Sequence, residues 1–307
     1  MMIRNFLFHR VSAEADDLWP PMHPVLFEKV IQFLTGHFKV VLLEEFLRNP
    51  SSYGGKVPLA TLSFDDGYKD NLSVAAPILL RHNCPASFYV VTDCINHSLP
   101  TWTYITDHFF QRSGENEFLL EKDFVPDSFR RINWNDPADG SQWSKKVKPW
   151  MKQLTNSQRI WVMEQLNSQA SDHTIPRNMM MNWDDIRQLH HLGFYVGSHS
   201  HTHPMLASLA EEKEIREELE LSARHIQLHL GHRPLTISYP IGSWDERVIK
   251  AAEETGYKYG LAVEQRFYDE IRDNTLIIPR VELYNESWWK TRLRISGLYQ
   301  KVKKLVR

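Results

Sequence analysis

Short strand-like runs alternate with helix-like stretches along most of this chain of 307 residues. The strand-like runs are rich in β-branched and aromatic residues, and they lie at residues 3–8, 38–42, 59–64, 86–91, 194–197, 235–239, 257–263 and 276–281. Apolar periodicity predicts helices over residues 24–36, 71–82, 183–192, 210–230 and 245–255. A strand, a helix and another strand in succession form a parallel sheet, either open or closed into a barrel. We therefore predict an α/β fold built on a parallel sheet.

Residues 97–180 interrupt this alternation. They separate two predicted strands by far more than an ordinary connection between a strand and a helix. The segment is rich in aromatic residues, namely Trp102, Tyr104, Phe109, Phe110, Trp134, Trp143, Trp150 and Trp161. We predict a helical insertion in which these rings pack a small hydrophobic core. The alternative is a lid whose rings form platforms for a sugar.

Composition and charge exclude several classes of function. Apolar residues make up 42% of the chain and charged residues 24%, as in soluble globular domains. The formal net charge of −2 argues against a chain that binds a polyanion over its whole surface, so we expect no nucleic-acid partner. Residues 1–17 lack the apolar core of a signal peptide, and no run approaches the roughly 18 apolar residues of a membrane span. We therefore expect a cytoplasmic location.

Two carboxylates directly follow the predicted strand at 59–64. Asp65 and Asp66 are costly neighbours at a strand end unless a cation is bound there. One of them could instead cap the helix predicted to begin at Asn71. The pair alone leaves both interpretations open.

A histidine-rich segment follows the predicted strand at 194–197. His199 and His203 can converge on one ion if the segment makes a helical turn, and His201 would then point away. In barrels and doubly wound sheets, the edge where strands end in this way is the active face. One carboxylate and two imidazoles make a three-ligand set that leaves coordination positions open. We therefore expect a divalent metal ion, with zinc as the favoured one.

Two segments resemble the first two motifs of the polysaccharide deacetylase family, carbohydrate esterase family four. They read TLSFDDGYKDN and VGSHSHTHPML, in this order. Weaker resemblances to the family are YPIGSW at residues 239–244, LFHRV near the start and IPRVEL at residues 278–283. The resemblance implies a distorted parallel (β/α) barrel of about seven strands. It also implies metal-dependent removal of N-acetyl groups, or in some members O-acetyl groups, from sugars.

The resemblance further implies roles for individual residues. Asp66, His199 and His203 would hold the metal ion, and Asp65 would be the general base. Separate roles for the two aspartates agree with the different directions of successive side chains at a strand end. A backbone N–H near Tyr239 would stabilise the oxyanion.

Two further positions carry alternatives. Arg280 resembles the family arginine that holds the catalytic aspartate charged and oriented, and the alternative is an ordinary surface ion pair. Many family members supply a histidine as the general acid in a late Leu-x-His motif, but no histidine follows His232 in this chain. His9, at the end of the first predicted strand, could protonate the amine, or Asp65 could carry the proton. The alternative for His9 is a buried histidine that is hydrogen-bonded within the fold.

The leading interpretation is an N-deacetylase whose partner is an acetylated carbohydrate or glycolipid. Its substrate would be an acetylated amino sugar in a glycan or a lipid-linked glycan precursor. One alternative is hydrolysis of another carbon–nitrogen amide bond, such as that of a cyclic imide or a formamide. Another is a barrel that binds glycans without turning them over, because the late histidine of the family is missing.

The end of the chain has a strong charge asymmetry. We take residues 1–287 as the barrel, including the insertion at 97–180, and residues 288–307 as a separate tail. The tail has seven basic residues and no acidic one, and its apolar residues recur at intervals of three and four. This pattern is typical of a basic amphipathic helix that lies on an anionic membrane or packs on the barrel with a solvated basic face. A membrane contact would bring a cytoplasmic enzyme to a lipid-linked sugar.

Overall fold

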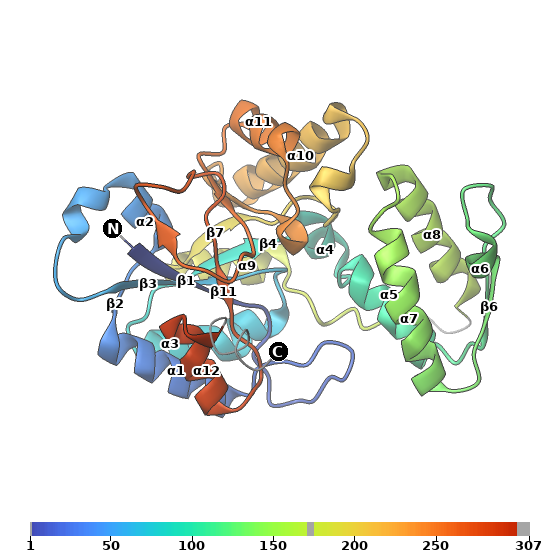
Figure 1. Cartoon of the computed structure of the whole chain (residues 1–307), viewed down its shortest axis with the longest axis horizontal. Helices are drawn as coiled ribbons and strands as arrows, with labels where there is room; N and C mark the ends of the chain where they lie inside the picture. Colours follow the sequence, from blue (N-terminus) through green and yellow to red (C-terminus); the bar gives the residue numbers. More distant parts are fainter. Residues whose placement is uncertain (1, 171–174, 300–307) are drawn as a thin grey trace.

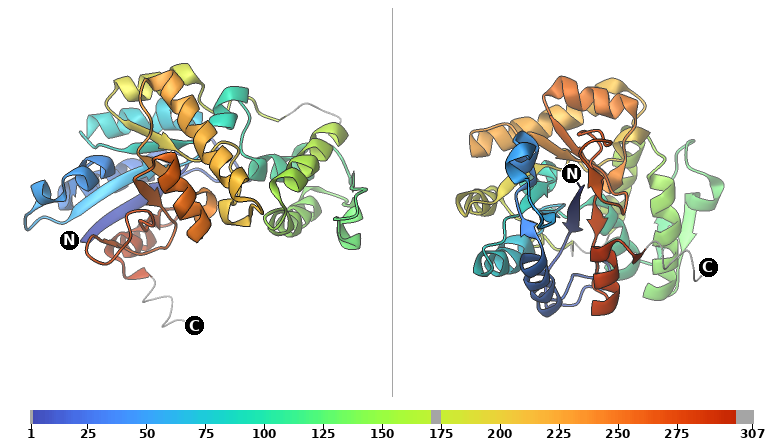
Figure 2. Two further views of the ribbon diagram at one scale, coloured as in Figure 1. Left: turned by 90° about the horizontal axis from the view of Figure 1, so that it is seen from above. Right: turned by 60° about the vertical axis from the view of Figure 1, so that its left-hand side comes forward.

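The computed structural model describes residues 2–170 and 175–299. A curled sheet forms its centre (Figures 1 and 2). The strands of this sheet are β1 (Met2–Phe8), β2 (Lys39–Val40), β3 (Leu59–Phe64), β4 (Ser87–Val90), β7 (Tyr195–Ser198), β8 (Thr236–Ser238), β9 (Tyr259–Leu261), β10 (Tyr268–Asp269) and β11 (Val281–Glu282). The main path has the order β10-β1-β3-β4-β7-β8-β9, with β2 paired to β3 and β11 paired to β1. The pairs within the sheet are parallel apart from β1 with β10.

The segment before β11 joins the two ends of this sheet. Ile278 forms a parallel bridge with Leu261 of β9, and its N–H donates to the Gly260 carbonyl over 2.7 Å. A few residues later, β11 pairs with β1 in parallel, with Val281 opposite Phe6. The predicted strand at 276–281 is therefore a bridge followed by a two-residue strand. The arrangement confirms the distorted (β/α) barrel of about seven strands.

Helices cover the outside of the barrel (Figure 1). They are α1 (Pro24–His37), α2 (Leu43–Arg48), α3 (Ala76–Arg81), α4 (Thr92–His97), α9 (Trp183–His191), α10 (Glu212–Leu230), α11 (Glu246–Thr255) and α12 (Trp288–Ser296). Short 3₁₀ turns lie at Pro50–Tyr53, Leu206–Ser208 and Pro240–Gly242. The helices bury apolar faces against the strands, because a parallel sheet has apolar side chains that must be shielded from water. Gly256 ends α11 with a φ of 97°, as its position after the periodic segment indicates.

The predicted helix at 71–82 forms in two pieces. A π-helical turn occupies Asn71–Ala75, and α3 follows it directly. The N–H of Ala76 reaches the carbonyl of Asn71, five residues earlier. Pro77 stands next and has no N–H to donate, so the usual hydrogen bond to the carbonyl four residues earlier cannot form at this position.

The predicted insertion lies to one side of the barrel (Figure 1). Its elements are α5 (Trp102–Arg112), β5 (Glu117–Leu119), α6 (Asp127–Arg130), β6 (Arg131–Asn133), α7 (Pro137–Met151) and α8 (Asn156–Gln169). β5 and β6 form a separate antiparallel pair. Trp102, Phe109, Phe110 and Trp134 are buried in a hydrophobic cluster made by residues of the insertion alone. The boundaries 97–180, 1–287 and 288–307 stay a prediction.

The described part of the predicted tail contacts the barrel. Thr291 and Ile295 of α12 are buried, and the ring of Trp288 lies edge-on to Phe33 of α1 with 5.5 Å between the ring centroids. Trp289 on the same helix is 59% exposed. Residues 300–307 of the predicted tail lie outside the described part of the chain. Within residues 2–170 and 175–299, no helix has the length and apolar character that crossing a bilayer requires.

Candidate active site

A sharp turn separates Asp65 and Asp66 at the end of β3. All six residues of β3 are buried, so the strand delivers both carboxylates into the interior, where they are 2% and 5% exposed. Asp66 has a φ of 75° and Gly67 a φ of 91°. Glycine suits the second position, because an added Cβ would lie 3.2 Å from side chains of Val90 and Ile95. The left-handed turn sends the two carboxylates to different partners.

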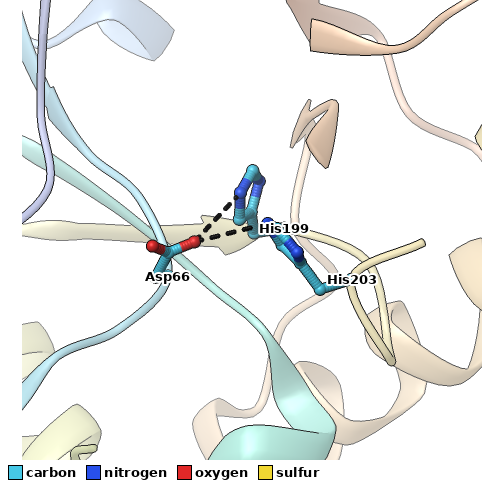
Figure 3. Close-up of side chains that lie close together, drawn as sticks. All are labelled: Asp66, His199 and His203. Carbon is cyan, nitrogen blue, oxygen red and sulfur yellow. Dashed lines mark ion pairs between the residues drawn. The ribbon is translucent and has the colours of Figure 1, made fainter. Parts of the chain in front are cut away.

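Asp66 lies against two imidazoles. Its Oδ1 is 3.4 Å from Nε2 of His199 and 3.4 Å from Nε2 of His203 (Figure 3). All three side chains are buried, and their candidate ligand atoms lie within 4.8 Å of one another. The structure therefore brings together the three side chains that the sequence resemblance assigns to a metal ion.

The histidines converge without the helical turn that their spacing suggested. That expectation was wrong: residues 199–203 form no helical turn, and Ser200 and His203 adopt φ values of 64° and 61° instead. The buried hydroxyl of Ser200 accepts the N–H of His203 over 3.1 Å. The ring of His201 points elsewhere, as predicted, with its Nδ1 2.9 Å from Oγ1 of Thr92.

The chemistry of this cluster fits a divalent metal ion. Nδ1 of His199 lies 2.8 Å from the Ser238 carbonyl. Because a carbonyl only accepts, Nδ1 carries a proton, and Nε2 is the nitrogen of this ring that could bind a metal ion. Burial lowers the pKa of His203 to about 3, so its imidazole is neutral at physiological pH. Its Nδ1 is buried and has no hydrogen-bond partner among the described residues. Two imidazoles and a carboxylate are a donor set that zinc favours.

Asp65 is clamped by Arg280. Nη1 of Arg280 donates to one carboxylate oxygen over 2.8 Å and Nη2 donates to the other over 2.7 Å. The arginine is fully buried, which makes the alternative of a surface ion pair wrong. Burial by itself would raise the pKa of Asp65, but the charge and hydrogen bonds of Arg280 together with the charge of His199 outweigh burial and hold that pKa below its usual value. Asp65 is therefore ionised and able to accept a proton.

Replacing Arg280 with lysine is expected to lower kcat by about tenfold without removing the metal ion. Lysine keeps the charge but cannot contact both oxygens of Asp65 in the bidentate geometry. The pKa of Asp65 should then rise, so the acidic limb of the pH–rate profile should move to higher pH. An unchanged acidic limb with normal metal content would contradict the positioning role of Arg280.

His9 lies at the same end of the barrel. It lines one cavity of about 400 Å³ together with Asp65, Asp66, His199 and His203. Its Nδ1 is 3.4 Å from a carboxylate oxygen of Glu282 in β11, and its ring stands edge-on to Trp19 with centroids 5.4 Å apart. His9 is partly exposed rather than buried, so a proton could pass between its imidazole and a bound molecule.

The chain is similar to known deacetylases. Residues 141–260 match the family model for polysaccharide deacetylase. The fold is similar to that of Streptococcus pyogenes deacetylase PplD in complex with acetate, with a TM-score of 0.63, 14% identity, and coverage of 96% of this chain and 98% of that one. The resemblance to polysaccharide deacetylases is confirmed. The chain is therefore a hydrolase acting on carbon–nitrogen bonds other than peptide bonds.

Two other solved structures share the fold of this chain. A de-N-acetylase from Aggregatibacter actinomycetemcomitans has a TM-score of 0.62 and 16% identity, and the match covers 96% of this chain and all 100% of that one. IcaB from Ammonifex degensii has a TM-score of 0.59 and 13% identity, with 97% of each chain covered. No curated protein sequence matches the chain. The family-model match includes both histidines but not Asp65, Asp66 or Arg280, which join the site through the fold.

Tyr239 itself cannot be the oxyanion donor of this deacetylase fold. Its N–H already donates to the Leu261 carbonyl over 3.0 Å, and its ring is buried in a hydrophobic cluster. Two residues later, Ile241 lines the cavity with a φ of 58°. No hydrogen bond within the described chain uses the N–H of Ile241. The free donor near Tyr239 is therefore Ile241.

Sequence reasoning missed two residues that hold the histidine loop. Buried Glu218 accepts the N–H groups of His201 and Thr202 over 3.0 and 2.8 Å. The signal was present, because Glu218 falls on the apolar stripe of α10, where a carboxylate is out of place. Trp102 of the insertion donates its Nε1–H to the His203 carbonyl over 2.9 Å, and no sequence pattern marks that contact.

Proposed function

We propose that this chain is a metal-dependent N-deacetylase that removes the acetyl group from an acetylated amino sugar of a glycan or lipid-linked glycan precursor. The observation that carries the proposal is the pair of neighbouring sites after β3. Asp66 faces His199 and His203, while Asp65 is held ionised by Arg280. A general base beside a three-ligand metal site is the arrangement that hydrolysis of an unactivated amide requires.

Each residue then has a defined part. A divalent ion held by Asp66, His199 and His203 would lower the pKa of water and polarise the acetyl carbonyl. Asp65 accepts the proton of the attacking water, and the N–H of Ile241 donates to the oxyanion that develops on the acetyl group. The amine must gain a proton when the carbon–nitrogen bond breaks. His9 supplies it, with Glu282 as the group that orients its ring.

Few aromatic rings of the insertion reach the cavity, where they could contact a sugar. Of the eight aromatic residues noted in the predicted insertion, Tyr104 alone lines this cavity. The others pack the insertion core or its edge, in agreement with the favoured packing interpretation. Trp19 of the barrel lines the same cavity and is 39% exposed. The sugar would therefore lie between Trp19 and Tyr104.

Acetate release tests the proposed function directly. Metal-loaded protein should release acetate from N-acetylglucosamine oligomers, and a chelator should abolish the release. Turnover of a cyclic imide or a formamide, with none of the acetylated sugar, would favour the other amide hydrolase. Oligomer binding without turnover of any of these compounds would favour the glycan-binding barrel.

Replacing His9 with glutamine should lower kcat on acetylated amino sugars by at least about tenfold, because the amine leaving group needs a proton. Hydrolysis of 4-nitrophenyl acetate should change far less, because a nitrophenolate leaves without protonation. Metal content should stay unchanged. Equal losses on the amide and the ester would contradict the acid role and favour proton transfer by Asp65.

The predicted tail should bind anionic vesicles in a salt-sensitive way. Deleting residues 288–307 should weaken this binding, but it also removes buried Thr291 and Ile295. Deleting only residues 300–307, which hold four basic residues, leaves α12 in place, and exchange of exposed Trp289 for serine provides a second test. Vesicle sedimentation at low and high salt measures the effect. Equal binding by all variants would contradict a peripheral role at the inner face of the membrane.

A further inference from the structure

Three lysines of the insertion face the site. Lys145, Lys148 and Lys152 line the cavity that holds Asp65 and Asp66. Their spacing of three and four residues places them on one side of α7 and its last turn. Buried residues of the same helix, Val147 and Met151, pack into the insertion core, which fixes the side that α7 turns toward the cavity.

Each carboxylate of the cavity already has a partner. Asp65 pairs with Arg280, and Asp66 faces the two histidines. Asp107 pairs with Lys148, and Glu282 pairs with His9. The ammonium groups of two other lysines at the cavity lack such a partner. No ion pair between described residues involves Lys145 or Lys152.

The environment of Lys152 also favours the binding of an anion. Its side chain is partly buried, and burial together with the charge of Lys148 lowers its pKa. A lysine in such surroundings is stabilised by an anion that enters the cavity. Lys145 is exposed at the same wall and can reach that anion without first breaking another contact.

We propose that the substrate carries a phosphate group, which Lys145 and Lys152 bind while its acetylated sugar lies at Asp65 and Asp66. Two unpaired ammonium groups match the nearly two negative charges of a phosphate monoester, and lysine binds phosphate as a point charge. A neutral glycan would bring no negative charge to either lysine. The inference rests on the proposed function, since it specifies the substrate of the same site.

The test compares three acetylated sugars on the metal-loaded full chain. N-acetylglucosamine 1-phosphate carries the phosphate, N-acetylmuramic acid carries a carboxylate, and the N-acetylglucosamine oligomer is neutral. The variant is Lys145→Ala/Lys152→Ala. Lys146→Ala is the matched control, because Lys146 lies on the same helix over the ring of Trp143 and does not line the cavity. Calorimetric binding and acetate release are both measured.

The sugar phosphate should bind more tightly than the other two sugars. The double variant should weaken its binding by about tenfold, as expected when two partly exposed ion pairs are lost. Binding of the neutral oligomer should change by less than about twofold, and Lys146→Ala should resemble the unmodified protein. Phosphate that contacts only a metal ion would bind equally well to the double variant.

The outcomes separate this inference from the proposed function. Acetate release with no preference for the sugar phosphate, or with a preference that the double variant keeps, would overturn the phosphate site and leave the deacetylase intact. Equal preference for the carboxylate sugar would overturn the assignment to phosphate. Lysine-dependent binding of the sugar phosphate without acetate release from any sugar would support the phosphate site and overturn the deacetylase.

Discussion

Replacing Asp65 with asparagine is expected to lower kcat on the order of 10²-fold or more while the metal content stays unchanged. Asparagine has nearly the same shape, but its amide cannot accept a proton from water. Because Asp65 contacts Arg280 rather than His203, its exchange removes proton transfer without removing a metal ligand. Metal analysis and steady-state kinetics on the same preparation measure both effects.

Asp66→Asn and Asp70→Asn provide the comparisons for this variant. Asp66→Asn should lose metal, since Asp66 faces both histidines. Asp70 is a partly buried carboxylate paired with Arg10 over 3.0 Å, but it does not line the cavity. Its exchange should affect stability more than kcat. Loss of metal from Asp65→Asn and retention by Asp66→Asn would mean that the two roles are reversed.

The double variant His199→Ala/His203→Ala is expected to lose both the metal ion and all measurable acetate release. Two of the three ligands disappear, and a single carboxylate holds a transition metal weakly. His201→Ala is the matched control in the same loop, because its ring contacts Thr92 instead of the cluster. That variant should keep its metal and most of its activity.

Elemental analysis after dialysis against trace metal measures the outcome. Each of the single variants His199→Ala and His203→Ala should show reduced metal content, and the double variant should show essentially none. Stoichiometric metal retained by the double variant would contradict the site. A folded double variant, verified by its circular dichroism spectrum, ensures that the loss comes from the ligands and not from unfolding.

The sequence predicted the parallel sheet because its strands are unusually clear, and the family resemblance predicted that the sheet closes into a barrel. Each of the eight predicted strands overlaps an observed strand, and β3 matches residues 59–64 in full. Strands of a parallel sheet are buried on both faces and read as continuous apolar runs. The abrupt change to carboxylates after β3 and to histidines after β7 therefore marked the active edge. β10 was missed because its two residues, Tyr268 and Asp269, are too few for any periodic signal.

Other parts of the site depend on features that a residue pattern does not encode. The histidines converge because Ser200 and His203 adopt left-handed backbone conformations, which residues other than glycine rarely do. The free N–H belongs to Ile241 because the sheet uses the N–H of Tyr239. The lysines of α7 reach the site only through the packing of the insertion beside the barrel. Each of these features follows from tertiary contacts between distant segments.

The closing segment of the barrel also determines when the site can come into existence during protein synthesis. Asp65 leaves the ribosome 215 residues before Arg280, and the edge of β1 that faces away from β3 is not fully paired until β10 and β11 have been made. A nascent or C-terminally truncated chain therefore has an open strand edge and lacks the cation that compensates Asp65. Barrel closure and the charge compensation of Asp65 both depend on residues 278–282, so a chain that ends before this segment lacks both.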